Sequence, residues 1–499
     1  MKRFLLITLS TFIALITWAG IIGDANNDGN VDVADITTIA SQILGNTPET
    51  FIFDNADVDG DNAITVSDIT GTAAIILGEP QIDDNTVLVT YNDATAKVQV
   101  ANNIKDKITF TVTGADVSIL ADASLDKEVN YILSGTTTDG MFQMDGDYKC
   151  TITLNGVNIT NNDNAAVQID CGKRIAIVVA DSTKNEFIDG KGKQKACFFV
   201  DGHAEFEGAG VLSITGNSKH AYSSNEYTQF KKKFTGAIGI KQAVSDGIHV
   251  KQYFQINNGI LIMNRISGDC IQVEGEEASE EKDNGNFIMK GGNILLYTNG
   301  TACDGIKADS LVTIADASLT IYNEGGAEWD EDKQKVSGAA GISGTSFEMT
   351  NSTLEIFAYG AGGKGISVDK DATFNSSKVH IETYGEVYEE NGDDTKPQCI
   401  KADSSIYVNG GNDTRIECFS VYGKGFSFDD EGTGKFEVDG NIVAVGDKKS
   451  EPTGGTASAF TYSKQNIEGG KEYEYNGLSF KAPSEYNHSS AKVLITVVE

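Results

Sequence analysis

Basic residues are scarce in this sequence. Its 499 residues include 39 Lys and Arg against 72 Asp and Glu, which gives a formal net charge of −33. So acidic a chain repels phosphate groups, which speaks against nucleic-acid binding and against any polyanion held by simple charge attraction. An acidic ligand would need a cation between itself and the protein.

Long apolar segments and zinc-type cysteine pairs are also lacking. The single long apolar run, Phe4 to Trp18, follows Lys2 and Arg3 and is too short to cross a bilayer. Its layout predicts a signal peptide over residues 1–20, and therefore a secreted or cell-surface protein; an internal core helix is the alternative. The seven cysteines form no CxxC pair, which disfavours structural zinc, and their odd number leaves at least one unpaired.

Glycine and a short repeat are what the sequence has in abundance. The 54 Gly, 5 Pro and 40% hydrophobic residues indicate a turn-rich globular chain with material for a large core. From about Ala165 to Tyr462 a pattern of five positions recurs roughly every 25–35 residues: a variable residue, a small one, a large apolar one, a polar one, then usually an apolar one, as in Asp246–Val250. The intervening segments, such as Leu319 to Ile321, read as strands too closely spaced for helices between them. The repeat predicts a mainly β fold, a right-handed parallel β-helix whose coils stack about 4.8 Å apart.

Each position of the pattern has its own chemistry. The large residue is expected to point inward in every coil, the second position to fill a crowded corner, and the fourth to face solvent. At the second position Cys197, Cys270 and Cys399 are expected to be buried thiols rather than part of a disulfide framework. The predicted inward column consists of Val167, Phe198, Tyr222, Ile248, Ile271, Ile306, Ile342, Ile366, Ile400, Phe426 and Phe460.

Residues 21–80 contain two loops with oxygen ligands at calcium spacing, each followed by an apolar helix (36–44 and 69–77). Gly29 and Asn62 occupy the sixth position, where the chain needs a sharp left-handed turn. This duplicate of one helix per loop resembles a type I dockerin. The resemblance implies as calcium ligands Asp24, Asn26, Asp28, Asp32, Asp35, Asp57, Asp59, Asp61 and Asp68.

The dockerin resemblance also implies a cohesin-type protein partner. At the partner-reading pairs the chain has Val33-Ala34 and Val66-Ser67, where well-known cellulosomal dockerins have Ser-Thr. A module that serves only as a structural unit is the alternative.

Residues 81–130 and 131–499 are predicted to be a β-strand cap and the β-helix domain. Strands are expected at 86–91, 97–100 and 108–112, where they would cover the open end of the solenoid. The phrases 171–175, 216–221 and 243–249 resemble the carbohydrate-binding β-helix family of secreted bacterial proteins, which is similar in fold to pectate lyases. The resemblance covers about 85–499 and implies binding of calcium and of polysaccharides, acidic ones included, without a demonstrated reaction.

The first pattern position carries an aspartate in three successive coils: Asp246, Asp269 and Asp304. Carboxylates stacked at coil spacing repel one another unless they share a cation or are well solvated. The resemblance makes them calcium ligands, whereas the alternative is that Asp suits the turn before the small residue. Beside them, His249 and Lys307 are candidate carbohydrate contacts, and Lys307 would be the base of a calcium-assisted lyase; a solvated surface lysine is the alternative.

Aromatic residues and acidic insertions give a second candidate surface. Insertions at 274–286, 323–337 and 386–397 are acidic, and the latter two are expected to leave the solenoid at one corner and wall a groove; solvated loops are the alternative. A row of outward rings could follow an extended glycan, or lie buried beneath the insertions. The candidate carbohydrate-binding aromatics are Tyr297, Tyr322, Trp329, Tyr359 and Tyr384.

Together these features predict a secreted, calcium-dependent polysaccharide-binding protein without catalytic residues. A polysaccharide lyase working by β-elimination and a structural or adhesive surface protein are the alternatives. Calcium is the expected cofactor, a polysaccharide and a cohesin the expected partners.

Overall fold

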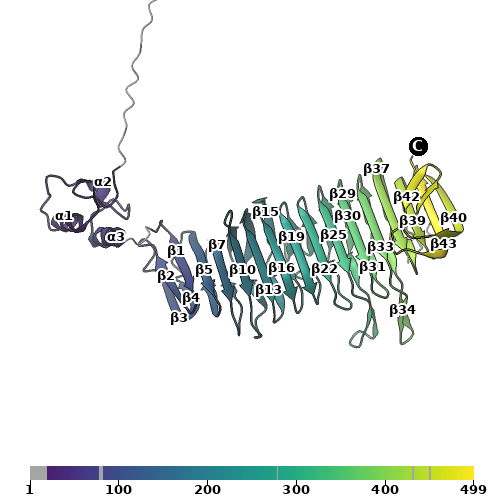
Figure 1. Ribbon diagram of the computed structural model, residues 1–499, viewed down its shortest axis with the longest axis horizontal. Helices are drawn as coiled ribbons and strands as arrows, with labels where there is room; N and C mark the ends of the chain where they lie inside the picture. Colours follow the sequence, from purple (N-terminus) through teal and green to yellow (C-terminus); the bar gives the residue numbers. More distant parts are fainter. Residues whose placement is uncertain (1–19, 78–81, 278, 430–431, 449–450, 499) are drawn as a thin grey trace, which may run out of the picture. The chain divides into compact units, whose positions relative to one another are not determined.

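The computed structural model describes residues 20–77, 82–277, 279–429, 432–448 and 451–498 (Figure 1). The predicted signal peptide lies outside these ranges except for its last residue. The described chain forms two compact units, one running to Asp84 with Ala101–Ile104 added, the other comprising the rest. Among the helices of the described ranges, none has the length and apolar character needed to cross a membrane.

The first unit holds the helices α1 (Val33–Ile43), α2 (Phe53–Ala56) and α3 (Val66–Ile76). Helices α1 and α3 each begin with a capping box, formed by Asp32 with Asp35 and by Thr65 with Asp68. Both therefore start three residues earlier than expected. The core is small and consists of Ala25, Ile39 and Ala56, packed by Phe51, Ile64 and Ile69.

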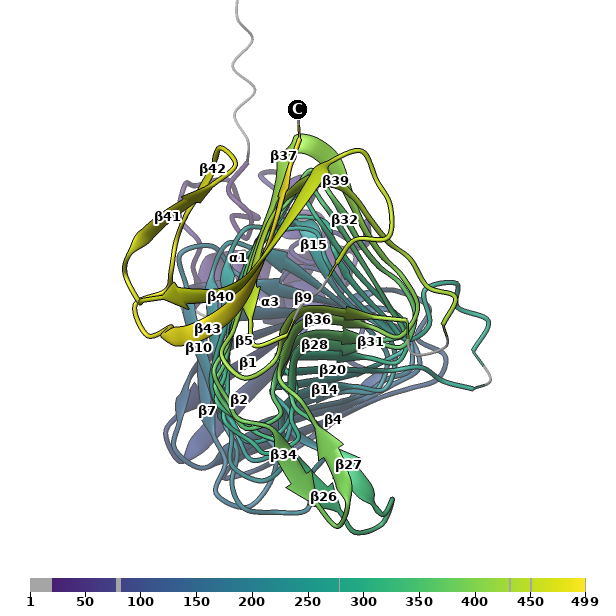
Figure 2. The ribbon, with the colours of Figure 1, turned by 90° about the vertical axis from the view of Figure 1, so that its right-hand side faces the viewer.

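The second unit is a parallel β-helix (Figures 1 and 2). A coil contributes one strand to a 13-stranded sheet and two to a 24-stranded sheet; β17, β18 and β19, for example, pair with β20, β21 and β22 of the next coil. The 13-stranded sheet consists of β3 (Ile108–Thr113), β4 (Ala115–Ala121), β6 (Gly140–Asp145), β8 (Val167–Asp170), β11 (Ala196–Val200), β14 (His220–Ser224), β17 (Ile248–Lys251), β20 (Ile271–Glu274), β23 (Ile306–Ala308), β28 (Ala340–Gly344), β31 (Lys364–Val368), β36 (Gln398–Ala402) and β38 (Lys424–Phe428).

The 24-stranded sheet forms the other two sides of the coils. It consists of β1 (Thr86–Asn92), β2 (Thr95–Val100), β5 (Val129–Thr137), β7 (Cys150–Thr160), β9 (Arg174–Val179), β10 (Lys184–Ile188), β12 (His203–Gly208), β13 (Val211–Gly216), β15 (Thr228–Phe234), β16 (Ala237–Ala243), β18 (Tyr253–Ile256), β19 (Ile260–Ile266), β21 (Asn286–Met289), β22 (Asn293–Thr298), β24 (Leu311–Ala315), β25 (Ser318–Asn323), β29 (Ser346–Thr350), β30 (Thr353–Ala358), β32 (Ala372–Asn375), β33 (Lys378–Thr383), β37 (Ile406–Ser420), β39 (Phe436–Gly446), β40 (Ser458–Ile467) and β43 (His488–Val497). Small hairpins are β26 (Glu328–Asp330) with β27 (Lys335–Ser337), β34 (Tyr388–Glu390) with β35 (Asp393–Thr395), and β41 (Glu472–Tyr475) with β42 (Leu478–Lys481).

The predicted inward column is confirmed from Val167 to Phe426. Strand register places each of its residues opposite the next, and all of them are buried. The prediction was wrong for the last member of the column, because Phe460 is 37% exposed. It lies on β40, which runs antiparallel to β43 and so belongs to no further coil.

The cysteines behave as compact apolar residues. All seven are free thiols, and Cys197, Cys270 and Cys399 are completely buried, as predicted. Only Cys303 is partly exposed.

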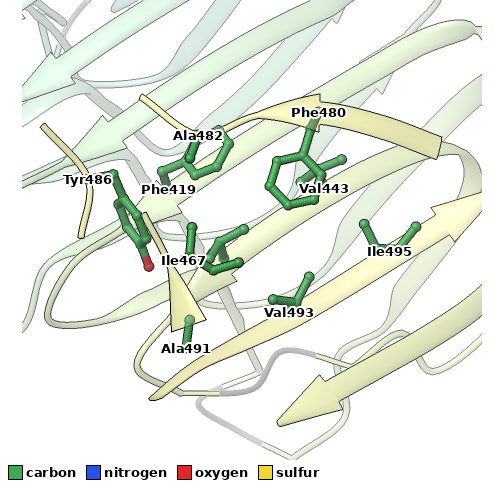
Figure 3. Close-up of a cluster of buried hydrophobic side chains, with 10 residues drawn as sticks. Phe419, Val443, Ile467, Phe480, Ala482, Tyr486, Ala491, Val493 and Ile495 are labelled. Carbon is green, nitrogen blue, oxygen red and sulfur yellow. The ribbon is translucent and has the colours of Figure 1, made fainter. Parts of the chain in front are cut away.

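Antiparallel strands lie at both ends of the stack. Strands β1, β2 and β3 lie where three strands were predicted before the solenoid. Strand β1 pairs antiparallel with β2 and parallel with β5. At the other end β43 runs antiparallel to β39, and a hydrophobic cluster including Phe419, Phe480 and Tyr486 fills the space beneath the last strands (Figure 3). The repeat did not reveal this second cap, which covers an otherwise open strand edge.

Candidate functional site

The outer surface of the 13-stranded sheet, called here the polar face, carries an unbroken row of mostly polar side chains. Because side chains alternate along a strand, the residue after each inward marker points away from the core. Register aligns these residues across neighbouring coils. The row consists of Gln168, Phe199, Ser223, His249, Gln272, Lys307, Ser343, Ser367, Lys401 and Ser427.

The three aspartates predicted as a calcium ladder lie beside this row and are 6–7% exposed. One oxygen of each accepts the backbone N–H of the equivalent residue in the next coil. Asp246 accepts from Asp269 at 3.0 Å, Asp269 from Asp304 at 2.6 Å, and Asp304 from Ala340 at 2.7 Å. The column therefore ties successive coils together through backbone hydrogen bonds.

The second oxygen of each aspartate faces an outward side chain. Oδ2 of Asp246 lies 2.9 Å from Nδ1 of His249, Oδ2 of Asp269 lies 3.5 Å from Nζ of Lys307, and Oδ2 of Asp304 accepts from Ser343. Every carboxylate thus has protein partners on both oxygens. This arrangement favours a structural role, and the calcium ladder stays a prediction.

The electrostatics follow from this burial. Burial and the neighbouring Asp269 raise the pKa of Asp304 to about 7. Burial opposes ionisation of Asp246 too, but its close contacts with the imidazoles of His220 and His249 hold its pKa below the usual range. Burial disfavours the charge of Lys307, yet Asp269 and Asp304 raise its pKa, so this lysine stays an ammonium group and is a poor base.

His220 and Lys364 occupy the same column as the aspartates and were missed in the sequence. Each directly precedes the small residue of its own repeat, which is the signal that could have found them. His220 lies 3.1 Å from Asp246. Lys364 donates to Thr395 of the β34–β35 hairpin, and burial with the nearby Lys401 lowers its pKa to about 8.

A second column of acidic residues lies along the other edge of the polar face. It stands three residues after Phe142, which pairs with Val167, and after seven of the inward markers, where the strands of the sheet end. In the other three coils Asn225, Lys251 and Thr345 occupy this place. This column was not predicted, because the prediction rested on the three coils with aspartate in the first position. Its acidic members are Asp145, Asp170, Asp201, Glu274, Asp309, Asp369, Asp403 and Asp429.

Two hairpins stand at the corner where the chain enters the polar face, as expected for the insertions at 323–337 and 386–397 (Figure 2). They touch each other, because the backbone N–H of Val336 donates to Asp393 at 2.8 Å. Trp329, half-buried, pairs with Val336 across the first hairpin. The insertion at 274–286 leaves from the opposite edge, after β20.

The predicted single row of tyrosines was wrong, since the structure has two short stacks. Tyr297, Tyr322 and Phe357 stack with ring centroids 4.7 and 4.8 Å apart, while Tyr359 and Tyr384 form a separate pair at 5.4 Å. Tyr297 and Tyr322 lie inside their strands, whereas Tyr359 and Tyr384 each lie one residue past theirs. Neighbouring rings cover most of the ring faces, so the open surfaces are at Tyr297 (36% exposed) and Tyr359 (39% exposed).

The two loops of the first unit are folded around their first aspartates. Asp24 accepts from the backbone N–H groups of Asp28 and Gly29, and Asp57 from those of Asp61 and Asn62. Gly29 and Asn62 have φ of 89° and 63°, which confirms the left-handed turn at the sixth position.

Buried charge gives a test of whether these loops fit a cation. Asp24, Asp35 and Asp68 are at most 2% exposed, and oxygens of Asp57, Asp59 and Asp61 lie within 4.8 Å of one another. Such a concentration of buried and crowded carboxylates calls for a positive charge, so the residues present fit Ca²⁺.

These features define the class: a parallel β-helix protein that carries an N-terminal module with two calcium loops. The family described as "Carbohydrate-binding domain-containing protein" matches residues 113–359, and the type I dockerin domain matches residues 22–71. The chain is thus similar to that carbohydrate-binding family over residues 113–359 and to type I dockerin domains over residues 22–71. Both predicted resemblances are confirmed, and dockerin domains bind calcium.

Two individual proteins are similar to parts of the chain. A carbohydrate-binding domain-containing protein of Acetivibrio thermocellus is 28% identical over 141 residues, which is 26% of this chain and 48% of that protein. This chain thus spans about half the length of that relative. A solved polysaccharide lyase-like protein from C. thermocellum is 21% identical, with a TM-score of 0.40 over 48% of this chain and 92% of that one.

Proposed function

We propose that this protein is an extracellular, calcium-dependent polysaccharide-binding protein that holds an acidic glycan along the polar face without cleaving it. Its dockerin would attach it to a cohesin-bearing partner. The observation that carries the proposal is the acidic column at the strand ends, which runs beside a row of hydrogen-bonding side chains over successive coils. A surface that repeats at the spacing of the coils suits a ligand that is itself a repeating chain.

Charge explains why calcium would be needed. With a net charge of −33 the protein repels a uronate polymer, and the acidic column adds local repulsion. Calcium ions shared between protein and sugar carboxylates would reverse the sign locally. The exposed Asp309 and Asp369 are better placed for such bridges than the buried Asp269, whose oxygens already have protein partners.

The borders of the polar face offer further contacts. The hairpins bring Trp329 to the corner at one edge, and the strands that lead to this corner end near Tyr359 and Tyr384. Within the row, His249 and Lys307 supply donors, and Lys307 carries the positive charge that a sugar carboxylate would seek. Tyr297 would contribute the exposed end of its stack, whereas Tyr322, stacked between two rings, would contribute its edge and hydroxyl group.

The dockerin surface supports a protein partner. Val33 and Val66 are 65% and 64% exposed, and Leu44 and Leu77 are 79% and 77% exposed. These residues occupy equivalent places at the two ends of α1 and α3, where solvent-exposed apolar side chains cost free energy unless a partner covers them. An apolar contact of this kind would replace the Ser-Thr recognition of well-known cellulosomal dockerins.

Affinity electrophoresis in polygalacturonate and in a neutral β-glucan, with calcium or with EGTA, tests the proposal. We expect retardation by polygalacturonate in calcium only, with weaker retardation of Asp309→Asn with Asp369→Asn. Glu348→Gln on β29, an exposed acidic position outside the polar face, is the matched control. Equal retardation in EGTA, or wild-type behaviour of the double variant, would contradict the calcium-bridging mechanism. Absence of binding to any glycan would leave the structural or adhesive alternative.

A further inference from the structure

Two histidines and an aspartate meet where the polar face passes from β14 to β17. His220 begins β14, Asp246 precedes β17, and His249 lies on β17. Oδ2 of Asp246 lies 3.1 Å from Nδ1 of His220 and 2.9 Å from Nδ1 of His249. The two imidazole rings lie 4.4 Å apart, and the three ligand atoms are within 4.8 Å of one another.

The polar contacts within this cluster are incompletely satisfied without a positive charge. Nδ1 of His220 faces two groups of opposite demand, the first being the backbone N–H of Asp246 at 3.3 Å, which needs an acceptor. The second is the carboxylate oxygen of Asp246 at 3.1 Å, which needs a donor or a cation. A neutral imidazole nitrogen cannot satisfy both contacts at once, and a cation between Nδ1 and the carboxylate would supply the positive charge that the nearly buried oxygen needs.

We propose that His220, Asp246 and His249 form a binding site for a divalent transition-metal ion of the zinc type. Two imidazole nitrogens and one carboxylate oxygen suit Zn²⁺, Co²⁺ or Ni²⁺, whereas Ca²⁺ takes six to eight oxygens. The site is thus chemically distinct from the oxygen-only loops of the dockerin domain.

The distances agree with a site that closes slightly in the absence of metal. Ligands about 2.05 Å from a tetrahedral ion lie about 3.3 Å from one another, so the present pairs need to separate by only a few tenths of an ångström. The side chain of His249 is 16% exposed, which leaves the outward side open for water or a ligand as fourth donor.

Glu274 completes the arrangement from the next coil. Its Oε2 lies 3.5 Å from Nε2 of His249, the nitrogen that would not bind the metal. A carboxylate at this place orients a metal-bound imidazole and increases its basicity, and loss of such a partner costs 10- to 100-fold in metal affinity in other proteins. Glu274 is therefore a positioning residue of the proposed site.

Zinc titration calorimetry on the full chain in saturating calcium tests the site, because the calcium occupies the dockerin loops beforehand. We expect one zinc site per chain, with affinity reduced at least tenfold in His249→Gln and in His220→Ala and about tenfold in Glu274→Gln. Cobalt absorption in the visible range should report a tetrahedral environment that His249→Gln abolishes. Glutamine is tolerated at this position of the row, since Gln168 and Gln272 occupy it in other coils; His249→Gln therefore decides the test if His220→Ala does not fold.

His203→Gln is the matched control, because His203 also lies near a carboxylate, 3.8 Å from Glu226, but stacks on Tyr227. It should bind zinc like the wild type. Absence of zinc binding in calcium, wild-type affinity of His249→Gln, or an equal loss in His203→Gln would overturn the proposal and leave a hydrogen-bonded cluster.

Discussion

Substitution of Asp269 separates the structural role of the aspartate column from a role in calcium binding. In the structure Oδ1 of Asp269 accepts the backbone N–H of Asp304 at 2.6 Å, and both residues are buried. Asp269→Ala removes the acceptor and leaves this N–H unpaired, which costs about 1–3 kcal/mol. Asp269→Asn keeps an oxygen in the same place and is expected to cost less than about 1 kcal/mol.

Hydrogen exchange measured by mass spectrometry on peptides covering 300–308 detects this loss directly. Because the opening of this coil is local, a cost of 1–3 kcal/mol should speed exchange at the Asp304 amide by roughly 5- to 150-fold in Asp269→Ala. Asp269→Asn should exchange nearly as the wild type does. If Asp269→Ala left this amide unchanged, or if Asn were as harmful as Ala, the backbone-bonding role would be refuted.

The same pair of variants bears on the calcium ladder predicted from the sequence. An amide is a weaker calcium ligand than a carboxylate and carries no charge. Loss of calcium-dependent glycan binding in Asp269→Asn, with hydrogen exchange unchanged, would therefore place the cation at this column. Retained binding would assign the bridging ions to the acidic column at the strand ends.

Further predictions concern the dockerin domain, a buried histidine and the absence of catalysis. Calcium should raise the helicity and melting temperature of residues 21–80, since their core is too small to fold well alone; an identical circular dichroism spectrum in EGTA would contradict this. Burial opposes the charge of His380, but hydrogen bonds to two glutamates raise its pKa to about 9, above the unfolded value near 6.5. The charged imidazole therefore stabilises the folded state by at most about 3 kcal/mol, fully below pH 6.5, and this stabilisation is lost as the pH rises through 9. Urea unfolding across this range should show the loss, and it should vanish in His380→Gln but not in His488→Gln. Polygalacturonate with calcium should yield no unsaturated ends by ultraviolet absorbance; were they to appear, abolition by Lys364→Gln but not by Lys307→Gln would identify Lys364 as the base.

The repeat was readable because a β-helix imposes the same demands on every coil. An inward side chain must be large and apolar and its neighbour at the corner small, so Ile271 and Cys270 recur in kind without any knowledge of the third dimension. The two dockerin loops were equally local, since all their expected ligands come from a few consecutive residues on each side of Gly29 and Asn62.

Contacts between coils were harder to predict, because they depend on register. His220 contacts Asp246 and His249 only because strands β14 and β17 align residue by residue. In the sequence, 26 positions separate His220 from Asp246. The stack of Tyr322 on Phe357 was not predicted for the same reason. Which two rings stack depends on where each strand ends, and a sequence locates strand ends only to within a residue or two.

The sequence by itself therefore determined the solenoid, the dockerin domain and the polarity of the outer face. These follow from local spacing and from the alternation of side chains along a strand. The tertiary structure decided where the charges find partners: it committed the oxygens of Asp269 to the next coil and to Lys307, and it closed the last coil with an antiparallel strand rather than a further repeat at Phe460. Both outcomes depend on free energies of contact between residues far apart in the chain, which no local pattern records.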